Sequence, residues 1–275
     1  MSELESLLME AELLYGHLLP PQFPASDRQR LHALLTVRPP GQPRLSPVFM
    51  TGLSGLLKAE LQQKGGPVDP SLLETTLTLA GTRICLWQGD ITRLACDAIV
   101  NAANDQMLGC FQPEHRCIDN VIHGAAGPEL REACASAIAT WPQSNLPVGS
   151  AEITQAHELP ARFVIHTVGP RMAPCAEEEP PEHQKARLAA CYESCLDKAA
   201  AHGCRSVAFC CISTGLFCFP KKPAAAIAIK SVLEWLTAHE GQLDIVVFDV
   251  FLSEDLAVYM DLVKHLSLCD MITMM

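Results

Sequence analysis

The sequence predicts a three-layer α/β/α protein that is preceded by a helical N-terminal segment. From about residue 82 onward, short apolar runs alternate with segments of helical periodicity. Several of these runs are apolar on both faces, which is typical of buried strands that helices cover on either side. The first 74 residues show only helical periodicity. We therefore expect a helical extension over residues 1–74 and an α/β domain over residues 75–275.

Three helices are predicted in the N-terminal extension. Apolar residues recur with helical spacing over residues 3–18, around residues 31–35 and over residues 50–61. Ser26 and Asp27 stand where either could cap the second helix, and Gly65 and Gly66 end the third. We expect these apolar stripes to pack against the rest of the protein rather than to bind a partner.

Five buried strands and several helices are predicted in the α/β domain. The strands are expected in TRICLWQGD (82–90), DAIVNAA (97–103), ARFVIHTVG (161–169), SVAFCCIST (206–214) and DIVVFDVFL (244–252). Helical patterns cover residues 119–139, 184–202, 222–239 and 254–266. In folds of this type ligands bind at the carboxyl ends of the strands, so the loops that follow these strands are the candidate site.

The composition narrows the classes of function. A formal charge of −11 argues against general binding of nucleic acids, which requires a basic face. The acidic start MSELESLL is unlike a secretory signal, and no apolar run approaches the ~20 residues that cross a bilayer. Thirteen cysteines without such a signal indicate thiols in a reducing compartment. We therefore expect an intracellular, cytoplasmic protein that does not bind membranes.

Cys110, His115 and Cys117 place three soft metal ligands within eight residues. Thiolate and imidazole together favour Zn²⁺, and a site with only three local protein ligands can keep its fourth position open to water or a substrate oxygen. The spacing matches none of the usual zinc-finger patterns. The alternative without a metal is a pair of buried thiols and a loop histidine.

Two polar segments follow the first two predicted strands. Asp90, in Gly-Asp-Ile-Thr, could accept a hydrogen bond from an adenine amino group or a ribose hydroxyl, or it could cap a turn. In NAAND, the amide of Asn104 suits a sugar hydroxyl. Asp119 and His123 are spaced i and i+4, so they share one face of a helix beside the metal ligands. There they could act on water or phosphate, or they could be a helix cap and a core imidazole.

A third segment, Ser213-Thr214-Gly215-Leu216-Phe217, follows the strand at 206–214. Glycine in a hydroxyl-rich loop lets successive backbone N–H groups converge on a pyrophosphate. A simple turn is the alternative, because the segment lacks the Walker and dinucleotide fingerprints.

Together, GDIT, NAAN, GCFxPxHxCIDNxIH and ISTGLF, in this order on an alternating chain, resemble the macrodomain family and, more narrowly, its zinc-dependent ADP-ribosyl-hydrolase branch. The resemblance covers about residues 75–270. It implies a mixed central sheet within three layers, the helical N-terminal extension of that branch and one Zn²⁺ per chain. Ordinary macrodomain hydrolases carry a glycine-rich segment where this chain has Cys110, His115 and Cys117, which agrees with the metal interpretation.

The resemblance also implies roles for individual residues. It assigns Asp90 to the adenine, with Ile91 as a backbone-side contact, and Asn104 to the distal ribose. Zinc would be bound by Cys110, His115 and Cys117, and the distal ribose would be lined by Cys117, Ile118 and Asp119. The diphosphate and ribose would be bound by Ser213, Thr214, Gly215, Leu216 and Phe217. Asn104, Asp119 and His123 are the candidate catalytic residues, the last two through the Asp-x-x-x-His helix of the family.

The function that the resemblance implies is a glycosidase-type hydrolase that removes mono-ADP-ribose from modified protein side chains. Its partners would be ADP-ribose and a mono-ADP-ribosylated protein. A non-catalytic reader of ADP-ribose would use the same loops without needing an open metal position. A third alternative is a zinc-stabilised interaction module with the N-terminal helices as its docking surface.

Overall fold

The computed structural model describes residues 2–20, 26–41, 43–173 and 179–273. A seven-stranded sheet of order β1-β2-β7-β6-β3-β5-β4 forms its centre. The strands are β1 (Leu77–Leu79), β2 (Thr82–Gln88), β3 (Ala98–Ala102), β4 (Ala151–Gln155), β5 (Phe163–Thr167), β6 (Ser206–Phe209) and β7 (Ile245–Val250). The five inner strands are parallel, whereas the edge strands β1 and β4 run antiparallel to their neighbours. The sheet is therefore mixed, as expected.

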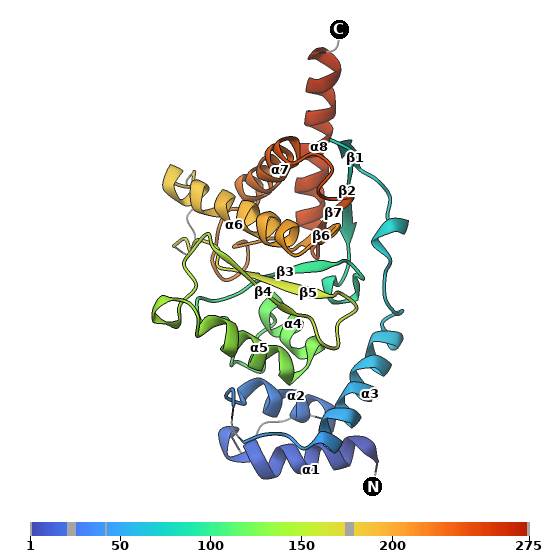
Figure 1. Cartoon of the computed structure of the whole chain (residues 1–275), viewed down its shortest axis with the longest axis vertical. Coiled ribbons are helices and arrows are strands. Elements are labelled where there is room, and N and C mark those ends of the chain that lie inside the picture. The colour runs from blue at the N-terminus through green and yellow to red at the C-terminus, as the bar shows by residue number, and fades with distance from the viewer. Residues whose placement is uncertain (1, 21–25, 42, 174–178, 274–275) are drawn as a thin grey trace.

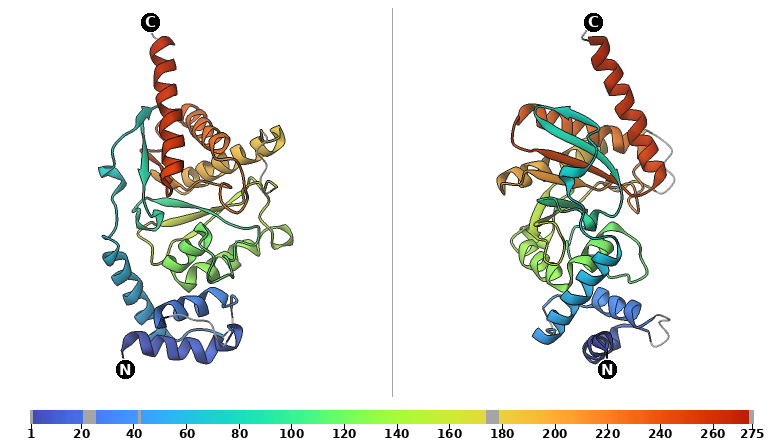
Figure 2. Two further views of the ribbon diagram at one scale, coloured as in Figure 1. Left: turned by 180° about the vertical axis from the view of Figure 1, so that it is seen from behind. Right: turned by 90° about the vertical axis from the view of Figure 1, so that its right-hand side faces the viewer.

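Helices cover both faces of the sheet, which confirms the predicted three layers (Figure 1). On one face lie α4 (Ile118–Ala126) and α5 (Pro128–Ile138), and on the other lie α6 (Glu182–Ala201), α7 (Lys221–Ala238) and α8 (Ser253–Thr273). The end of α8 projects beyond the sheet (Figure 2). Within the described parts of the chain, no helix combines the length and the apolar character that crossing a membrane requires.

The structure differs from the sequence prediction at three elements. The helical pattern over 119–139 is two helices, because Gly127 adopts a positive φ of 83° and Pro128 then begins α5. The edge strands β1 and β4 were not predicted. Neither contains the continuous apolar run that marks the buried strands, since β1 has only three residues and β4 reads AEITQ.

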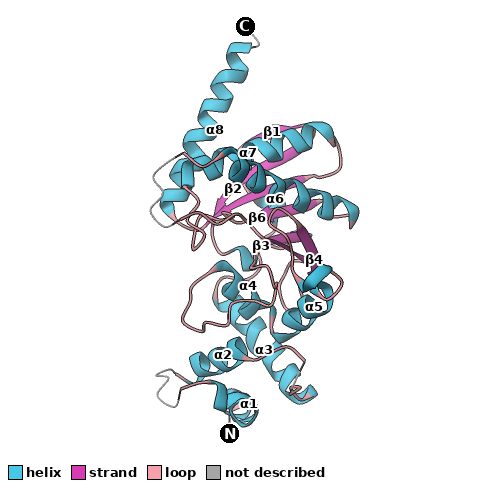
Figure 3. Cartoon of the chain, turned by 90° about the vertical axis from the view of Figure 1, so that its left-hand side faces the viewer, coloured by secondary structure: helices cyan, strands magenta, loops and turns pink. Residues whose placement is uncertain are grey.

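The N-terminal helices α1 (Glu3–Tyr15), α2 (Asp27–Val37) and α3 (Pro47–Gln63) pack around a hydrophobic cluster of their own. Ser26 caps α2 through its side chain, as one of the two predicted alternatives. Figure 3 shows this group beneath α4 and α5, at the opposite end of the molecule from the C-terminus. The cluster is separate from the core around the sheet. The boundary at residues 74 and 75 stays a prediction.

Arg131 on α5 joins the N-terminal helices to the loop that precedes α4. Its guanidinium donates to the carbonyl of Leu108 at 2.8 Å and to that of Leu35 at 3.1 Å, and it also reaches the carbonyl of Arg38. The side chain lies over the ring of Phe111, 4.6 Å from its centroid. Burial lowers the pKa of Arg131 to about 10, so the group stays charged near neutral pH.

Replacing Arg131 with Met is expected to lower the free energy of unfolding by about 3 kcal/mol, because three carbonyls lose a buried, charged donor. Arg205 is the matched control, since its guanidinium also donates to two carbonyls but is 50% exposed. Arg205→Met should cost less than about 1 kcal/mol. Urea denaturation of both variants measures the difference, and equal losses would contradict the role of Arg131.

Candidate metal centre and nucleotide cleft

A cleft of about 1050 Å³ opens at the carboxyl ends of the parallel strands. It is lined by nearly every residue that the sequence singled out, namely Asp90, Ile91, Asn104, Cys110, His115, Cys117, Ile118, Asp119, Ser213, Thr214, Gly215, Leu216 and Phe217. His123 is the exception. It is 6% exposed and lies behind Asp119, outside the lining of this cleft.

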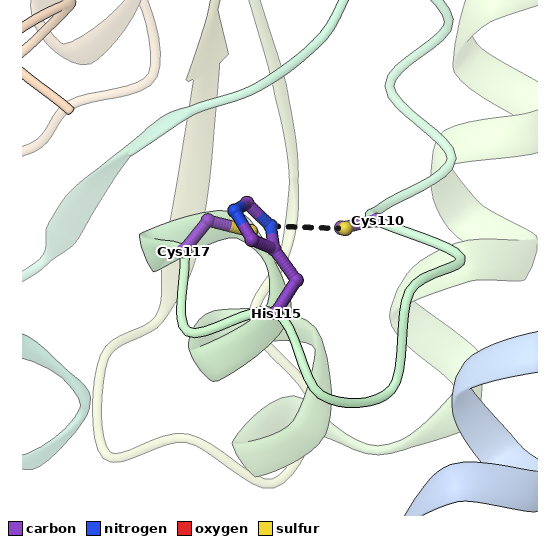
Figure 4. A group of neighbouring side chains, drawn as sticks. All are labelled: Cys110, His115 and Cys117. Atoms are coloured by element: carbon purple, nitrogen blue, oxygen red, sulfur yellow. Dashed lines mark hydrogen bonds between the residues drawn. The ribbon is translucent and has the colours of Figure 1, made fainter. Parts of the chain in front are cut away.

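Cys110, His115 and Cys117 come together in the loop between β3 and α4 (Figure 4). Their ligand atoms all lie within 4.8 Å of one another, and Sγ of Cys110 is 3.4 Å from Nδ1 of His115. In a tetrahedral zinc site with Zn–S near 2.3 Å and Zn–N near 2.0 Å, two such ligands stand about 3.5 Å apart. The three residues therefore fit a zinc ion in both chemistry and spacing.

Helix α4 fixes the positions of Cys117 and His115 among the three candidate metal ligands. Cys117 is the N-cap of α4, and its sulfur accepts from the backbone N–H of Asn120 at 3.4 Å. The side-chain amide of Asn120 donates to the carbonyls of Gln112 at 3.0 Å and His115 at 2.9 Å. Burial, together with the nearby Cys110, raises the pKa of the Cys117 thiol to about 12. A cation between the sulfurs would reverse that shift by stabilising the thiolates.

Asp119 lies in the first turn of α4 and is held by a series of buried polar side chains. Asn101 donates to Oδ1 of Asp119 at 2.8 Å, and its Nδ2 lies 3.2 Å from Nδ1 of His166. An amide nitrogen only donates, so Nδ1 of His166 accepts and its Nε2–H faces Oγ1 of Thr154 at 2.9 Å. Burial lowers the pKa of His166 to about 4, which keeps the ring neutral. Burial raises the pKa of Asp119 to about 6, against the hydrogen bond from Asn101.

A second group of soft ligands lies behind Asp119. His123, Cys134 and His166 bring their ligand atoms within 4.8 Å of one another, and all three are buried. Burial raises the pKa of the Cys134 thiol and lowers the pKa of His123. Nε2 of His123 is 3.5 Å from Oδ1 of Asp119 and has no hydrogen-bond partner among the described residues. His123 is thus a buried neighbour of the carboxylate that does not line the cleft.

Asn104 closes the loop that carries the metal ligands. Its Oδ1 accepts from the backbone N–H of Gln106 at 3.1 Å, and its Nδ2 donates to the carbonyl of Gly109 at 3.0 Å. The side chain is half-buried and lines the cleft. It therefore shapes the loop as well as facing the space where a sugar is expected.

Asp90 lies at one end of the cleft, where it caps a short 3-10 helix at residues 91–93. Its carboxylate accepts from the backbone and hydroxyl of Thr92 and pairs with Nζ of Lys64 at 2.9 Å. Burial alone raises the pKa of Asp90, but these partners outweigh burial and lower it. The turn-cap alternative is correct for Asp90, and the ionised carboxylate still lines the cleft.

The loop at residues 213–217 also lines the cleft. Ser213 adopts a positive φ of 67°, and a Cβ at Gly169 would collide with its Oγ, so only glycine fits there. Within the described chain, no group accepts a hydrogen bond from the backbone N–H groups of residues 214–217. These N–H groups are available to an anion, and the binding of a diphosphate by this loop stays a prediction.

Comparison with known proteins places the chain in a family. The Macro domain family model matches residues 100–228. A protein-ADP-ribose hydrolase of Staphylococcus aureus is 48% identical over 66% of this chain, which spans 66% of that relative, just under two thirds. A protein-ADP-ribose hydrolase of Treponema medium is 40% identical over 93% of this chain and 94% of its own length. The macrodomain of Trypanosoma brucei, solved with ADP-ribose, superposes with a TM-score of 0.63 at 32% identity, covering 81% of this chain and 92% of that one.

The chain belongs to the macrodomain family, which confirms the resemblance that its motifs carry. Its relatives that span nearly the whole chain include proteins named protein-ADP-ribose hydrolase.

The sequence did not predict several residues of the site. Asn120 contacts the predicted ligand His115, and Lys64 pairs with the predicted carboxylate Asp90. His166 contacts Asn101, which holds Asp119, and Asp249 lines the cleft. His166 and Asp249 lie inside apolar strands, where a single polar residue in a buried run is the one signal that could have marked them. Nothing local in the sequence marks Lys64.

Replacing Asn120 with Ala should weaken metal binding by about 10- to 100-fold, because Gln112 and His115 lose the donor that orients their loop. Asn145→Ala, at an exposed site, is the control that should leave metal binding unchanged. Competition with a chromophoric chelator measures both affinities. Equal affinities in the two variants would show that the loop needs no such support.

Proposed function

We propose that this protein is a zinc-dependent hydrolase that removes mono-ADP-ribose from modified protein side chains. The observation that carries this proposal is that the metal-ligand group and Asp119 line the same cleft as the residues expected to bind ADP-ribose. The names of the Staphylococcus and Treponema relatives support the hydrolase activity. The Cys-His-Cys donor set supports zinc.

The cleft can hold ADP-ribose without a strongly basic lining. The free N–H groups of residues 214–217 would hold the diphosphate, which suits a chain of net charge −11. Asp90 would accept from the exocyclic amine of the adenine, beside the backbone of Ile91. Asn104, Ile118 and Asp119 would then face the distal ribose, and Phe217 would pack against it.

The reaction breaks the bond between the anomeric carbon of the distal ribose and the modified side chain. Zinc, held by Cys110, His115 and Cys117, supplies a Lewis acid that stabilises negative charge when bound. Asp119 orients the attacking water and accepts its proton as the new C–O bond forms. The proton then passes to the leaving side chain, which yields free ADP-ribose and the unmodified protein. Asn101 and His166 keep the carboxylate of Asp119 in place for this step.

Replacing Cys117 with Ser should remove most bound zinc and reduce release of ADP-ribose from a mono-ADP-ribosylated protein by at least about 100-fold. A chelator should do the same to the natural protein, and added Zn²⁺ should restore activity. Cys204→Ser, a buried thiol remote from the cleft, is the control that keeps both zinc and activity. Full turnover by a metal-free Cys117→Ser variant would remove zinc from the mechanism.

Replacing Asp119 with Asn should reduce the rate of ADP-ribose release by about 100-fold or more, because an amide cannot accept the proton of water. ADP-ribose binding, measured by calorimetry, should change little. Asp105→Asn, at an exposed carboxylate in the loop that precedes α4, should retain the rate. If the natural protein binds ADP-ribose but releases none from a modified protein under any of these conditions, it is a reader and not a hydrolase.

A further inference from the structure

A second buried carboxyl group lies beside Asp90 at the base-binding end of the cleft. Asp249 is the next-to-last residue of β7. It pairs in register with Trp87 of β2 and so lies near Gly89 and Asp90, which follow that strand. It is 5% exposed, lines the cleft, and its Oδ1 has no hydrogen-bond partner within the described chain. Neither the sequence motifs nor the reaction described above uses this residue.

The surroundings of Asp249 favour its neutral form. Burial and, to a smaller extent, the negative charge on Asp90 raise the pKa of Asp249 to about 8. A hydrogen bond from the backbone N–H of Gly89 lowers this pKa but does not outweigh burial. Asp90 is kept ionised by its partners Thr92 and Lys64. The two neighbouring carboxyls therefore differ in charge at neutral pH, because one has cationic and hydroxyl partners and the other has none.

The other ionisable groups around Asp249 come from the segment after β6, from α7 and α8, and from the β2 side. Cys211, two residues beyond the end of β6, is half-buried, and desolvation raises the pKa of its thiol further from neutrality. Asp255, on α8, pairs with Nζ of Lys221 of α7 at 3.0 Å. On the β2 side, Asp249 faces the carboxylate of Asp90, which is paired with Lys64. Asp249 differs from these groups in that burial raises its pKa to about 8.

We propose that Asp249, as the neutral acid, donates a hydrogen bond to a ring nitrogen of the adenine bound in the cleft. This inference rests on the proposed binding of ADP-ribose. Adenine presents an exocyclic amine, which donates, and ring nitrogens, which accept, so its recognition needs an acceptor and a donor. Asp90 supplies the acceptor and Asp249 supplies the donor.

The Oδ1 atom of Asp249, which has no hydrogen-bond partner among the described residues, supports a role in binding. Buried polar groups in folded proteins nearly always have a hydrogen-bond partner, and one without a partner is costly. A bound base that hydrogen-bonds to Asp249 removes this cost in the complex. It also makes the site selective for a ligand that accepts a hydrogen bond at that point.

Calorimetry with ADP-ribose between pH 7 and pH 9.5 tests this role on the zinc-loaded protein. Affinity should be full below pH 8 and should fall by about tenfold per pH unit above it, because the ionised carboxylate cannot donate. Asp249→Asn, whose amide donates at every pH, should bind with nearly constant affinity across this range. Asp90→Asn is the control: it should weaken binding at every pH and keep a decline, which should begin at a lower pH because the charge on Asp90 no longer raises the pKa of Asp249.

The outcomes separate this inference from the proposed function. Parallel profiles for the natural protein and Asp249→Asn would overturn the role of Asp249 while leaving ADP-ribose binding intact. Failure of the natural protein to bind ADP-ribose at any pH would overturn the proposed function itself, and this inference with it.

A measurement on the natural sequence keeps the test valid if Asp249→Asn does not fold. ADP analogues that replace one ring nitrogen of the base with C–H, at position 1, 3 or 7, are compared at pH 7 and pH 9.5. One of them should bind more weakly than ADP at pH 7 and lose the pH dependence. If all three keep the decline that ADP itself shows, Asp249 does not donate to the base.

Discussion

The side-chain amide of Asn120 binds the carbonyls of Gln112 and His115, and the arrangement of the whole site depends on this pair of hydrogen bonds. They fold a loop without regular secondary structure back onto the first turn of α4, where Cys117 is the N-cap. The imidazole and the two sulfurs then meet beside Asp119, at the carboxyl ends of the strands. A loop of this length would otherwise have to lose much conformational entropy on binding a metal, because its backbone would be free.

The same loop is tied from behind to the N-terminal helices. Arg131 reaches the carbonyl of Leu108 in the loop and the carbonyls of Leu35 and Arg38 at the end of α2. The N-terminal helices therefore do more than cover apolar surface, since a buried cation connects them to the segment that carries Cys110. We infer that loss of these helices would loosen the metal centre even though none of its ligands comes from them.

The sequence was sufficient for those features that are local in the chain. The five inner strands are continuous apolar runs, and the metal ligands and Asp119 lie within ten residues of one another, so both could be predicted. The edge strands could not, because a strand that is exposed on one side needs no apolar run. Asn120, His166 and Asp249 could not be assigned roles either, because their partners are distant in sequence or are carbonyls that any residue supplies. The helix break at Gly127 depends on one positive φ, which a helical repeat does not reveal.

The proposed function requires a metal ion held by two thiolates and one imidazole, with its remaining position free on the side of the cleft. X-ray absorption at the zinc edge, on protein purified without added metal, tests this requirement most directly. We expect one zinc per chain with two sulfur and one imidazole neighbours and a lighter fourth neighbour that changes when ADP-ribose is added. Absence of zinc, or four protein ligands that do not respond to ADP-ribose, would contradict it.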